Sequence, residues 1–198
     1  MKPEVFDIFF SAFKKKYEIL QTAREAFSIY QLIERVKNIE GDFIEIGSYS
    51  GGSAKLISLF KQNSRKFYIF DTFEGLADTG PLDTGLKNGY LCYSNLETFK
   101  TLLSDSSVII QKGYFPQCAG ELLNSNKFSF VHLDVDTYES TRNCLDFFNN
   151  KMAKGGIILT HDYSHPALKG VKKAFDEFHK GEIGVRIQKT SQLFVEYA

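Results

Sequence analysis

Three carboxylates and one imidazole follow two apolar segments of this 198-residue chain. Asp134 and Asp136 come after the first segment, Phe128–Leu133. His161 and Asp162 follow the second segment, Ile157–Thr160. Such segments are typical of buried parallel strands, which end at one edge of a sheet. Carboxylates and imidazoles are ligands for divalent cations. A single aspartate at a strand end is usually a turn or cap residue, but four such groups at two strand ends favour a metal site.

A glycine-rich turn connects the first predicted strand to a helix. It reads Glu45-Ile46-Gly47-Ser48-Tyr49-Ser50-Gly51-Gly52-Ser53, and its glycines allow the backbone to approach a ligand closely. The spacing matches neither the GxGxxG dinucleotide fingerprint nor a phosphate-binding loop. Asp71 ends the next strand, where a carboxylate can accept hydrogen bonds from the ribose hydroxyls of an adenosine-bearing ligand. The alternative for Asp71 is a cap or turn role.

Alternating strand and helix patterns predict how these groups are positioned. Helical spacing in residues 1–38 predicts one or two N-terminal helices before the first strand. We expect an α/β fold with a mostly parallel seven-stranded sheet and a C-terminal antiparallel hairpin, in a single domain spanning residues 1–198. The predicted strands are Phe43–Ile46, Phe67–Phe70, Val108–Ile110, Phe128–Leu133, Ile157–Thr160, Val185–Gln188 and Leu193–Tyr197.

Residues 74–93 form a long segment with little hydrophobic periodicity. Glycines alternate there with aspartates and threonines, and the segment follows the second predicted strand. Loops of this length inside a compact domain are usually functional, and ligands bind on this side of open α/β sheets. We predict a lid over the substrate, and the alternative is an inert surface insertion.

Composition and charge exclude several classes of protein. The formal net charge is zero, so no overall field attracts nucleic acid or an acidic membrane surface. The three cysteines are scattered, which suits a reducing compartment, and no segment reads as a membrane span or signal peptide. We expect a cytoplasmic protein with a small-molecule partner. The 19 phenylalanines and 10 tyrosines leave room for a homo-oligomeric interface.

Four segments of the chain carry a family resemblance. They are Gly41-Asp42-Phe43-Ile44-Glu45-Ile46-Gly47 with Gly51-Gly52-Ser53; Asp71-Thr72-Phe73-Glu74-Gly75-Leu76; His132-Leu133-Asp134-Val135-Asp136-Thr137-Tyr138-Glu139-Ser140-Thr141; and Gly155-Gly156-Ile157-Ile158 with His161-Asp162-Tyr163. Together they resemble the macrocin O-methyltransferase (TylF/MycF) group of class I S-adenosylmethionine-dependent methyltransferases. The resemblance implies a Rossmann-like fold, S-adenosyl-L-methionine as cofactor, magnesium, and methylation of a sugar hydroxyl on a small molecule.

The resemblance also implies roles for individual residues. Asp134 would be a metal ligand together with His161 and Asp162, and Asp136 would be the general base. The family usually has an aspartate where this chain has His161. Because magnesium prefers oxygen ligands and imidazole suits manganese, either the metal preference differs or His161 lies outside the metal shell. Cofactor binding would fall to Glu45, Gly47, Ser53, Asp71 and Thr72.

Two further classes of function remain open. Residues 134–137 also match the D-x-D-x-T start of haloacid-dehalogenase-like phosphatases and, loosely, the D-x-D of metal-dependent glycosyltransferases. Those phosphatases carry the motif on their first strand, whereas here it lies two-thirds along the chain. A methyltransferase-like fold that binds a ligand without turnover is the non-enzymatic alternative, which the departure at His161 permits.

Overall fold

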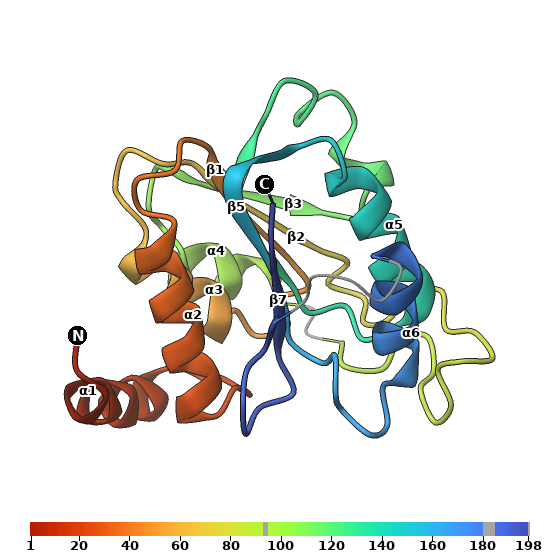
Figure 1. Ribbon diagram of the computed structural model, residues 1–198, viewed down its shortest axis with the longest axis horizontal. Coiled ribbons are helices and arrows are strands. Elements are labelled where there is room, and N and C mark those ends of the chain that lie inside the picture. The colour runs from red at the N-terminus through yellow and green to blue at the C-terminus, as the bar shows by residue number, and fades with distance from the viewer. Residues whose placement is uncertain (93–94, 180–184, 198) are drawn as a thin grey trace.

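A computed structural model describes residues 1–92, 95–179 and 185–197 of the chain. A seven-stranded sheet with the strand order β3-β2-β1-β4-β5-β7-β6 forms its centre (Figure 1). The strands are β1 (Asp42–Ile46), β2 (Phe67–Asp71), β3 (Val108–Lys112), β4 (Phe128–Leu133), β5 (Met152–Thr160), β6 (Val185–Arg186) and β7 (Leu193–Glu196).

Helices cover both faces of the sheet. The first four lie on one face and the last two on the other (Figure 1). Alternate strand residues point to opposite faces, so Phe43 and Phe130 pack towards the first helices, and Ile44 and Val131 towards the last two. The helices are α1 (Pro3–Lys16), α2 (Ala23–Arg35), α3 (Gly52–Phe60), α4 (Leu96–Leu102), α5 (Tyr138–Phe148) and α6 (Lys169–Phe178), with a 3-10 turn η1 (Gln117–Ala119) after β3.

The strand directions confirm the predicted α/β class. Strands β1 to β5 are parallel, β7 runs antiparallel to β5, and β6 runs antiparallel to β7. The strand order reverses between β1 and β4, where ligands bind in open α/β sheets. β5 begins at Met152, earlier than the apolar run from Ile157 predicts, because Met152 pairs with Phe128 before a register shift.

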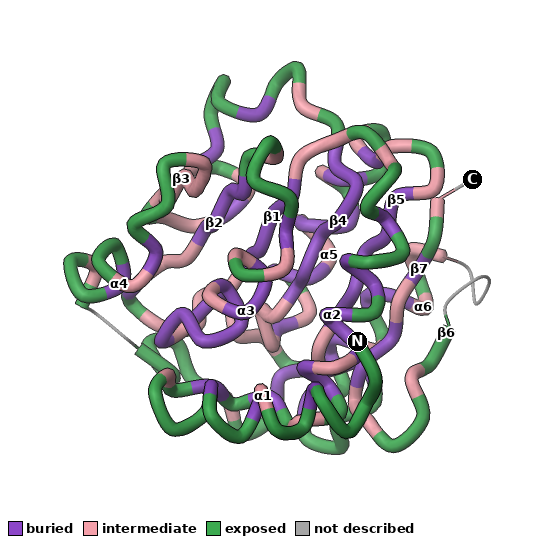
Figure 2. Tube along the Cα trace, turned by 90° about the vertical axis from the view of Figure 1, so that its left-hand side faces the viewer, coloured by how far each residue is buried: buried purple, intermediate pink, exposed green. Residues whose placement is uncertain are grey.

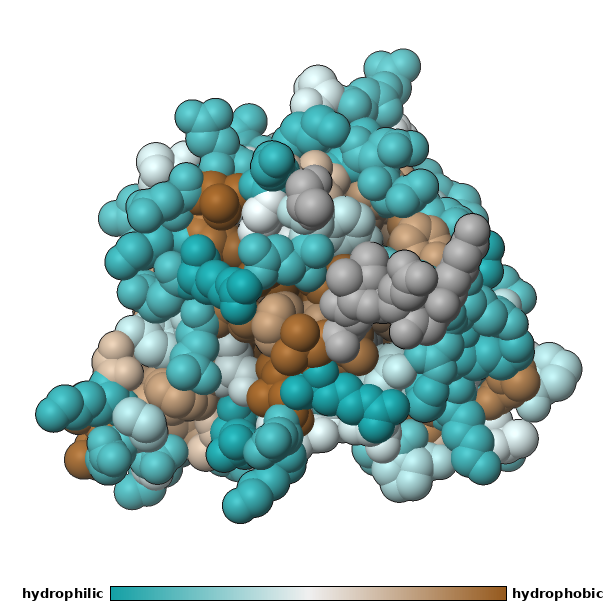
Figure 3. All heavy atoms as spheres, in the orientation of Figure 1, coloured by the Kyte–Doolittle hydropathy of each residue, from teal (hydrophilic) through white to brown (hydrophobic). Residues whose placement is uncertain are grey.

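The burial of the chain follows this layering. Figure 2 shows the central strands β1, β4 and β5 buried along most of their length, while α1 at the surface exposes much of its outer side. Three phenylalanines of α1 are buried, whereas Val5 and Ile8 on the same helix are 53% and 74% exposed. Hydrophilic residues cover most of the face in Figure 3. No helix in the described ranges is long and apolar enough to cross a membrane.

Candidate active site

A pocket of about 240 Å³ lies at the carboxyl ends of β1, β2, β4 and β5. It brings together residues from both predicted sets, the cofactor turn and the metal cluster. Glu45 is the one candidate site residue that does not line it. The candidates that do are Gly47, Ser53, Asp71, Thr72, Asp134, Asp136, His161 and Asp162.

The glycine turn brings the end of β1 against the end of β4. Gly47 has a φ of 81°, and a Cβ atom there would lie 2.0 Å from the carbonyl oxygen of Asp134. Glycine is therefore required both for the left-handed backbone and for the close approach of the two strand ends. This contact fixes the predicted cofactor turn directly beside the carboxylate cluster.

Asp71 shapes the turn through backbone hydrogen bonds. Its Oδ2 accepts from the backbone N–H groups of Ser48 at 2.7 Å and Tyr49 at 3.1 Å, and its Oδ1 accepts from that of Phe73 at 2.7 Å. The turn role that the sequence left open is thus present. Each carboxylate oxygen has two lone pairs, so a ribose contact is compatible with these bonds and stays a prediction. The neighbouring Thr72 donates its hydroxyl to the carbonyl of Gly75 at 2.7 Å.

Glu45 supports the turn from beneath instead of reaching the pocket. Its side chain points to the α1–α4 face of the sheet and is fully buried. One carboxylate oxygen lies 2.7 Å from Nδ1 of His132, and the other accepts a hydrogen bond of 2.7 Å from the Ser48 hydroxyl. The resemblance implied that Glu45 contacts the cofactor directly, but its side chain does not line the pocket.

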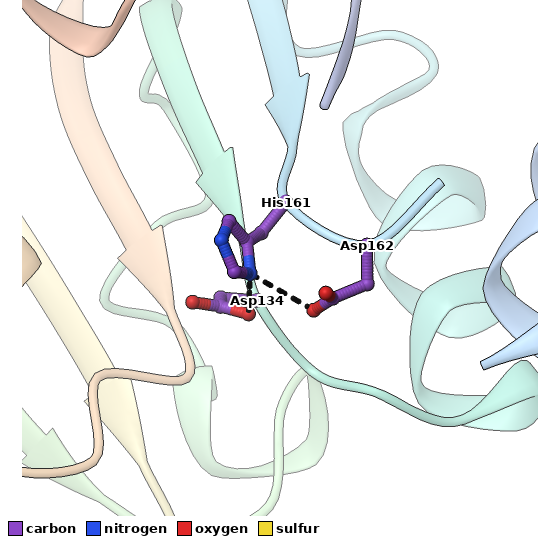
Figure 4. Close-up of side chains that lie close together, drawn as sticks. All are labelled: Asp134, His161 and Asp162. Carbon is purple, nitrogen blue, oxygen red and sulfur yellow. Dashed lines mark hydrogen bonds and ion pairs between the residues drawn. The ribbon is translucent and has the colours of Figure 1, made fainter. Parts of the chain in front are cut away.

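Asp134, His161 and Asp162 point toward one another at the strand ends (Figure 4). Their potential ligand atoms all lie within 4.8 Å of one another. Nδ1 of His161 is 3.3 Å from Oδ1 of Asp134 and 3.0 Å from Oδ2 of Asp162. Asp136 has a left-handed backbone with a φ of 60° and lines the same pocket as these three residues. The two strand ends meet as the sequence predicted.

The charges of this cluster are strongly coupled. Burial alone would raise the pKa of Asp134, but the charge and hydrogen bond of His161 outweigh burial and lower that pKa to about 2. Burial would lower the pKa of His161, but the charge of Asp134 and hydrogen bonds to the surrounding carboxylates raise it. Burial, followed by the charges of Asp134 and Asp162, raises the pKa of Asp136. Burial also raises the pKa of Asp162, so the cluster sets one imidazole among three carboxyl groups of which only Asp134 has a lowered pKa.

Sequence reasoning missed two side chains that reach the cluster from the start of α2. Gln21 donates a hydrogen bond of 3.0 Å from Nε2 to Oδ2 of Asp134, and Oε2 of Glu25 lies 3.7 Å from Nε2 of His161. Thr22 and Glu25 form a capping box, and the Thr-x-x-Glu spacing that marks one is visible in the sequence. The approach of this helix end to β5 has no such local signal.

The predicted lid borders the pocket. Four of its residues, Gly75, Leu76, Ala77 and Leu91, line the pocket, and its two arms are joined by the backbone hydrogen bonds of Leu76 with Tyr90 and Gly89, each 2.8 Å long. The end of the predicted segment, Tyr93, lies outside the described residues. A lid function stays a prediction.

Comparisons with known proteins agree on a family of enzymes. A curated relative is the 8-demethyl-8-(2,3-dimethoxy-alpha-L-rhamnosyl)-tetracenomycin-C 4'-O-methyltransferase of Streptomyces olivaceus, 26% identical over 149 residues, covering 66% of this chain and 56% of that protein. Another is the demethyldecarbamoylnovobiocin O-methyltransferase of Streptomyces niveus, 25% identical over 169 residues, covering 76% and 63%. The chain thus spans less than two thirds of the length of either relative.

A solved structure and a family model complete the comparison. The O-methyltransferase NovP superposes with a TM-score of 0.74 at 22% identity over 89% of this chain and 80% of that one, which shows a shared fold. The model of the macrocin O-methyltransferase (TylF) family matches residues 21–190. That range contains the glycine turn, the carboxylate cluster and the strands β1 to β5 that hold them. The chain therefore belongs to the macrocin O-methyltransferase (TylF) family.

Proposed function

We propose that this chain is an S-adenosylmethionine-dependent O-methyltransferase acting on a hydroxyl of a sugar or sugar-containing small molecule. The observation that carries the proposal is one pocket bordered by both the glycine turn with Asp71 and the cluster with Asp136. The two relatives are named as O-methyltransferases of glycosylated or sugar-bearing natural products, which supports the same acceptor class. The D-x-D motif follows the fourth strand, which disfavours a phosphatase of the haloacid-dehalogenase type.

The glycine turn and Asp71 would hold the cofactor. Gly52 and Ser53 are the first residues of α3 and line the pocket, so their backbone N–H groups lie at a helix N-terminus that favours a negatively charged group. Asp71 would accept a hydrogen bond from a ribose hydroxyl at Oδ1, which accepts one backbone N–H, whereas Oδ2 already accepts two. The turn and the carboxylate cluster border one pocket, so a cofactor held by the turn would lie beside an acceptor held at the cluster, and such positioning is a large part of catalysis in a displacement reaction.

Asp134, His161 and Asp162 would hold a divalent cation. The donor set fits, because the potential ligand atoms of the three side chains lie within 4.8 Å of one another and Nδ1 of His161 faces both carboxylates. A bound cation would lower the pKa of the acceptor hydroxyl and stabilise the charge that develops on it. Two oxygen donors and one nitrogen suit manganese as well as magnesium. A metal ion would compete with the proton for the imidazole nitrogen.

Asp136 would take the proton of the acceptor hydroxyl. In the reaction the carbon–sulfur bond of the sulfonium breaks, a carbon–oxygen bond forms, and the hydroxyl proton passes to the carboxylate. Asp136 lines the pocket and is placed by the left-handed backbone that follows β4. A carboxylate must be ionised to act as a base, and a cation in the cluster would offset the charges of Asp134 and Asp162 that raise the Asp136 pKa.

Calorimetric titration with S-adenosylmethionine tests the cofactor site. Asp71→Asn removes the charge and one acceptor oxygen, so we expect affinity to fall by about tenfold. Asp105→Asn, an exposed aspartate that does not line the pocket, is the control and should bind normally. Wild-type affinity in a folded Asp71→Asn protein would remove Asp71 from the cofactor site.

Thermal unfolding with and without metal tests the cluster. Magnesium or manganese should raise the melting temperature, and Asp134→Asn combined with Asp162→Asn should abolish that rise. His161→Asp should increase the effect of magnesium relative to manganese, because it replaces a nitrogen donor with oxygen. A wild-type protein that shows no metal-dependent shift and keeps its turnover in a chelator would contradict the metal site.

A further inference from the structure

We propose that Asp83 of the lid is a positioning residue for Asp136, which it holds through the first backbone N–H of α5. The inference rests on the proposed function, because it concerns the residue that would take the acceptor proton. It is carried by the burial of Asp83 in the lid, by the space that Gly170 leaves for its carboxylate, and by the strained turn that presents Asp136.

Asp83 is the one buried residue of the lid. It is 3% exposed, whereas the other residues from 74 to 92, a range that the structure describes throughout, are half-buried or exposed. An aspartate is rarely buried unless its oxygens are paired. Oδ1 of Asp83 accepts the backbone N–H of Tyr138 at 2.9 Å, and Oδ2 accepts that of Gly80 at 2.9 Å. The lid therefore docks through this carboxylate on the N-terminus of α5, which favours a negative charge.

The second residue of α6 leaves the space that this carboxylate occupies. The lid passes beside the start of α6 (Figure 1), and a Cβ atom at Gly170 would lie 2.3 Å from Oδ1 of Asp83 and 3.0 Å from the Cβ atom of Tyr138. Glycine in a helix is less favourable than alanine, and the backbone of Gly170 has no positive φ that would require it. The close approach of Asp83 is therefore the reason for this glycine.

Asp136 lies at the centre of a tight turn. The N–H of Thr137 donates to the carbonyl of Val135 at 2.7 Å, and Asp136 between them has a φ of 60°. Three-residue turns with a positive φ at the centre are rare and strained, and such a backbone persists where the surrounding structure fixes it. On the β4 side, the N–H of Asp134 donates to the carbonyl of Ile46 at 3.0 Å. On the other side, the start of α5 must hold the turn.

The lid supplies part of that hold two residues after Asp136. Thr137 is the buried N-cap of α5, and its hydroxyl accepts the N–H of Ser140 at 3.4 Å. The N–H of Tyr138 is bound by Asp83, 55 positions earlier in the chain. Asp83 does not line the pocket, so it acts on a bound acceptor only through the backbone that it holds. A docked lid therefore fixes how Asp136 faces the pocket.

Hydrogen exchange of single backbone amides, measured by NMR, tests the inference without an acceptor. Asp83→Ala should raise the exchange rates of the Tyr138 and Thr137 amides at least about tenfold, because a hydrogen bond to a charged group contributes about that factor. Asn95→Ala is the matched control, since it removes the side-chain cap on the N–H of Thr98 in α4 and should leave both rates unchanged. Faster exchange at Tyr138 with a wild-type rate at Thr137 would show a simple helix cap and overturn the inference.

Gly170→Ala reaches the same docking point from α6 and leaves the lid sequence intact. The added Cβ should displace the carboxylate of Asp83 and reproduce the faster exchange at Thr137. Lys169→Ala, at an exposed neighbouring position of the same helix, is the control and should not change that rate. A wild-type Thr137 rate in a folded Gly170→Ala protein would contradict the proposed hold on the turn.

Kinetics separate this inference from the proposed function. The probes are S-adenosylmethionine and a panel of 4-nitrophenyl glycosides, with release of S-adenosylhomocysteine as the readout. For any glycoside that the wild type methylates, Asp83→Ala should lower kcat at least about tenfold and leave KM and cofactor affinity within about threefold, since Asp83 touches neither ligand. An unchanged kcat would overturn the inference. A wild type that binds no S-adenosylmethionine or methylates no glycoside would count against the proposed function, while the exchange rates still decide whether Asp83 holds the turn.

Discussion

Removing either partner of the buried Glu45–His132 pair should destabilise the protein strongly. Both side chains are fully buried, and their carboxylate oxygen and Nδ1 lie 2.7 Å apart. Glu45→Leu or His132→Leu leaves a polar or charged group buried without its partner, which costs about 3–5 kcal/mol of unfolding free energy. For a chain of this length that loss corresponds to a melting temperature lower by about 6–20 °C. The double leucine variant should lose less than the sum of the single losses, because it buries no orphaned partner.

Urea unfolding of the four proteins measures this coupling. The wild type, both single variants and the double variant form a complete cycle, and Glu45→Gln serves as a milder change that retains a hydrogen bond to His132. Additive losses, or single losses below about 1 kcal/mol, would refute the assignment of a coupled buried pair. Folded Glu45→Gln should bind S-adenosylmethionine within about threefold of the wild type, since Glu45 does not line the pocket. A tenfold loss would make Glu45 a cofactor contact after all.

Two further predictions concern a glycine and an acidic side chain. Gly47→Ala should lower the unfolding free energy by several kcal/mol more than Gly85→Ala in urea titrations, because both have positive φ but only Gly47 would place Cβ against the backbone of Asp134. Hydrogen bonds from the backbone and hydroxyl of Ser107 lower the pKa of Asp105 to about 2. Its stabilisation is therefore present above about pH 4 and lost as pH falls towards 2, so stability in Asp105→Asn should depend less on pH in that range.

The order of apolar runs was sufficient to predict the layered sheet and the meeting of two strand ends. Parallel strands share their carboxyl edge, so the convergence of Asp134 with His161 and Asp162 follows once Phe128–Leu133 and Ile157–Thr160 are read as neighbouring strands. The terminal hairpin is equally local, because a short turn separates its two strands.

Contacts that depend on strand order and on helix placement could not be read from the sequence. Glu45 and His132 pair because β1 lies directly beside β4, although 87 positions separate them in the chain. The sequence contains no local pattern that shows β1 and β4 to be neighbouring strands. Glu25 reaches His161 for a similar reason: its capping-box spacing is visible, but the packing of α2 beside the end of β5 is a tertiary result.

The hydrogen bonds of Glu25 also bear on when the site is completed during synthesis. The hydroxyl of Ser191, in the turn between β6 and β7, donates to Oε1 of Glu25 at 3.1 Å, while Oε2 of the same carboxylate faces His161. Residues that line the pocket all leave the ribosome before Ser191 does. In a nascent chain, every pocket residue can therefore have left the ribosome while Glu25 still lacks its hydrogen bond from Ser191. The hydrogen bonds around the site are complete only when the C-terminal hairpin has packed against the sheet.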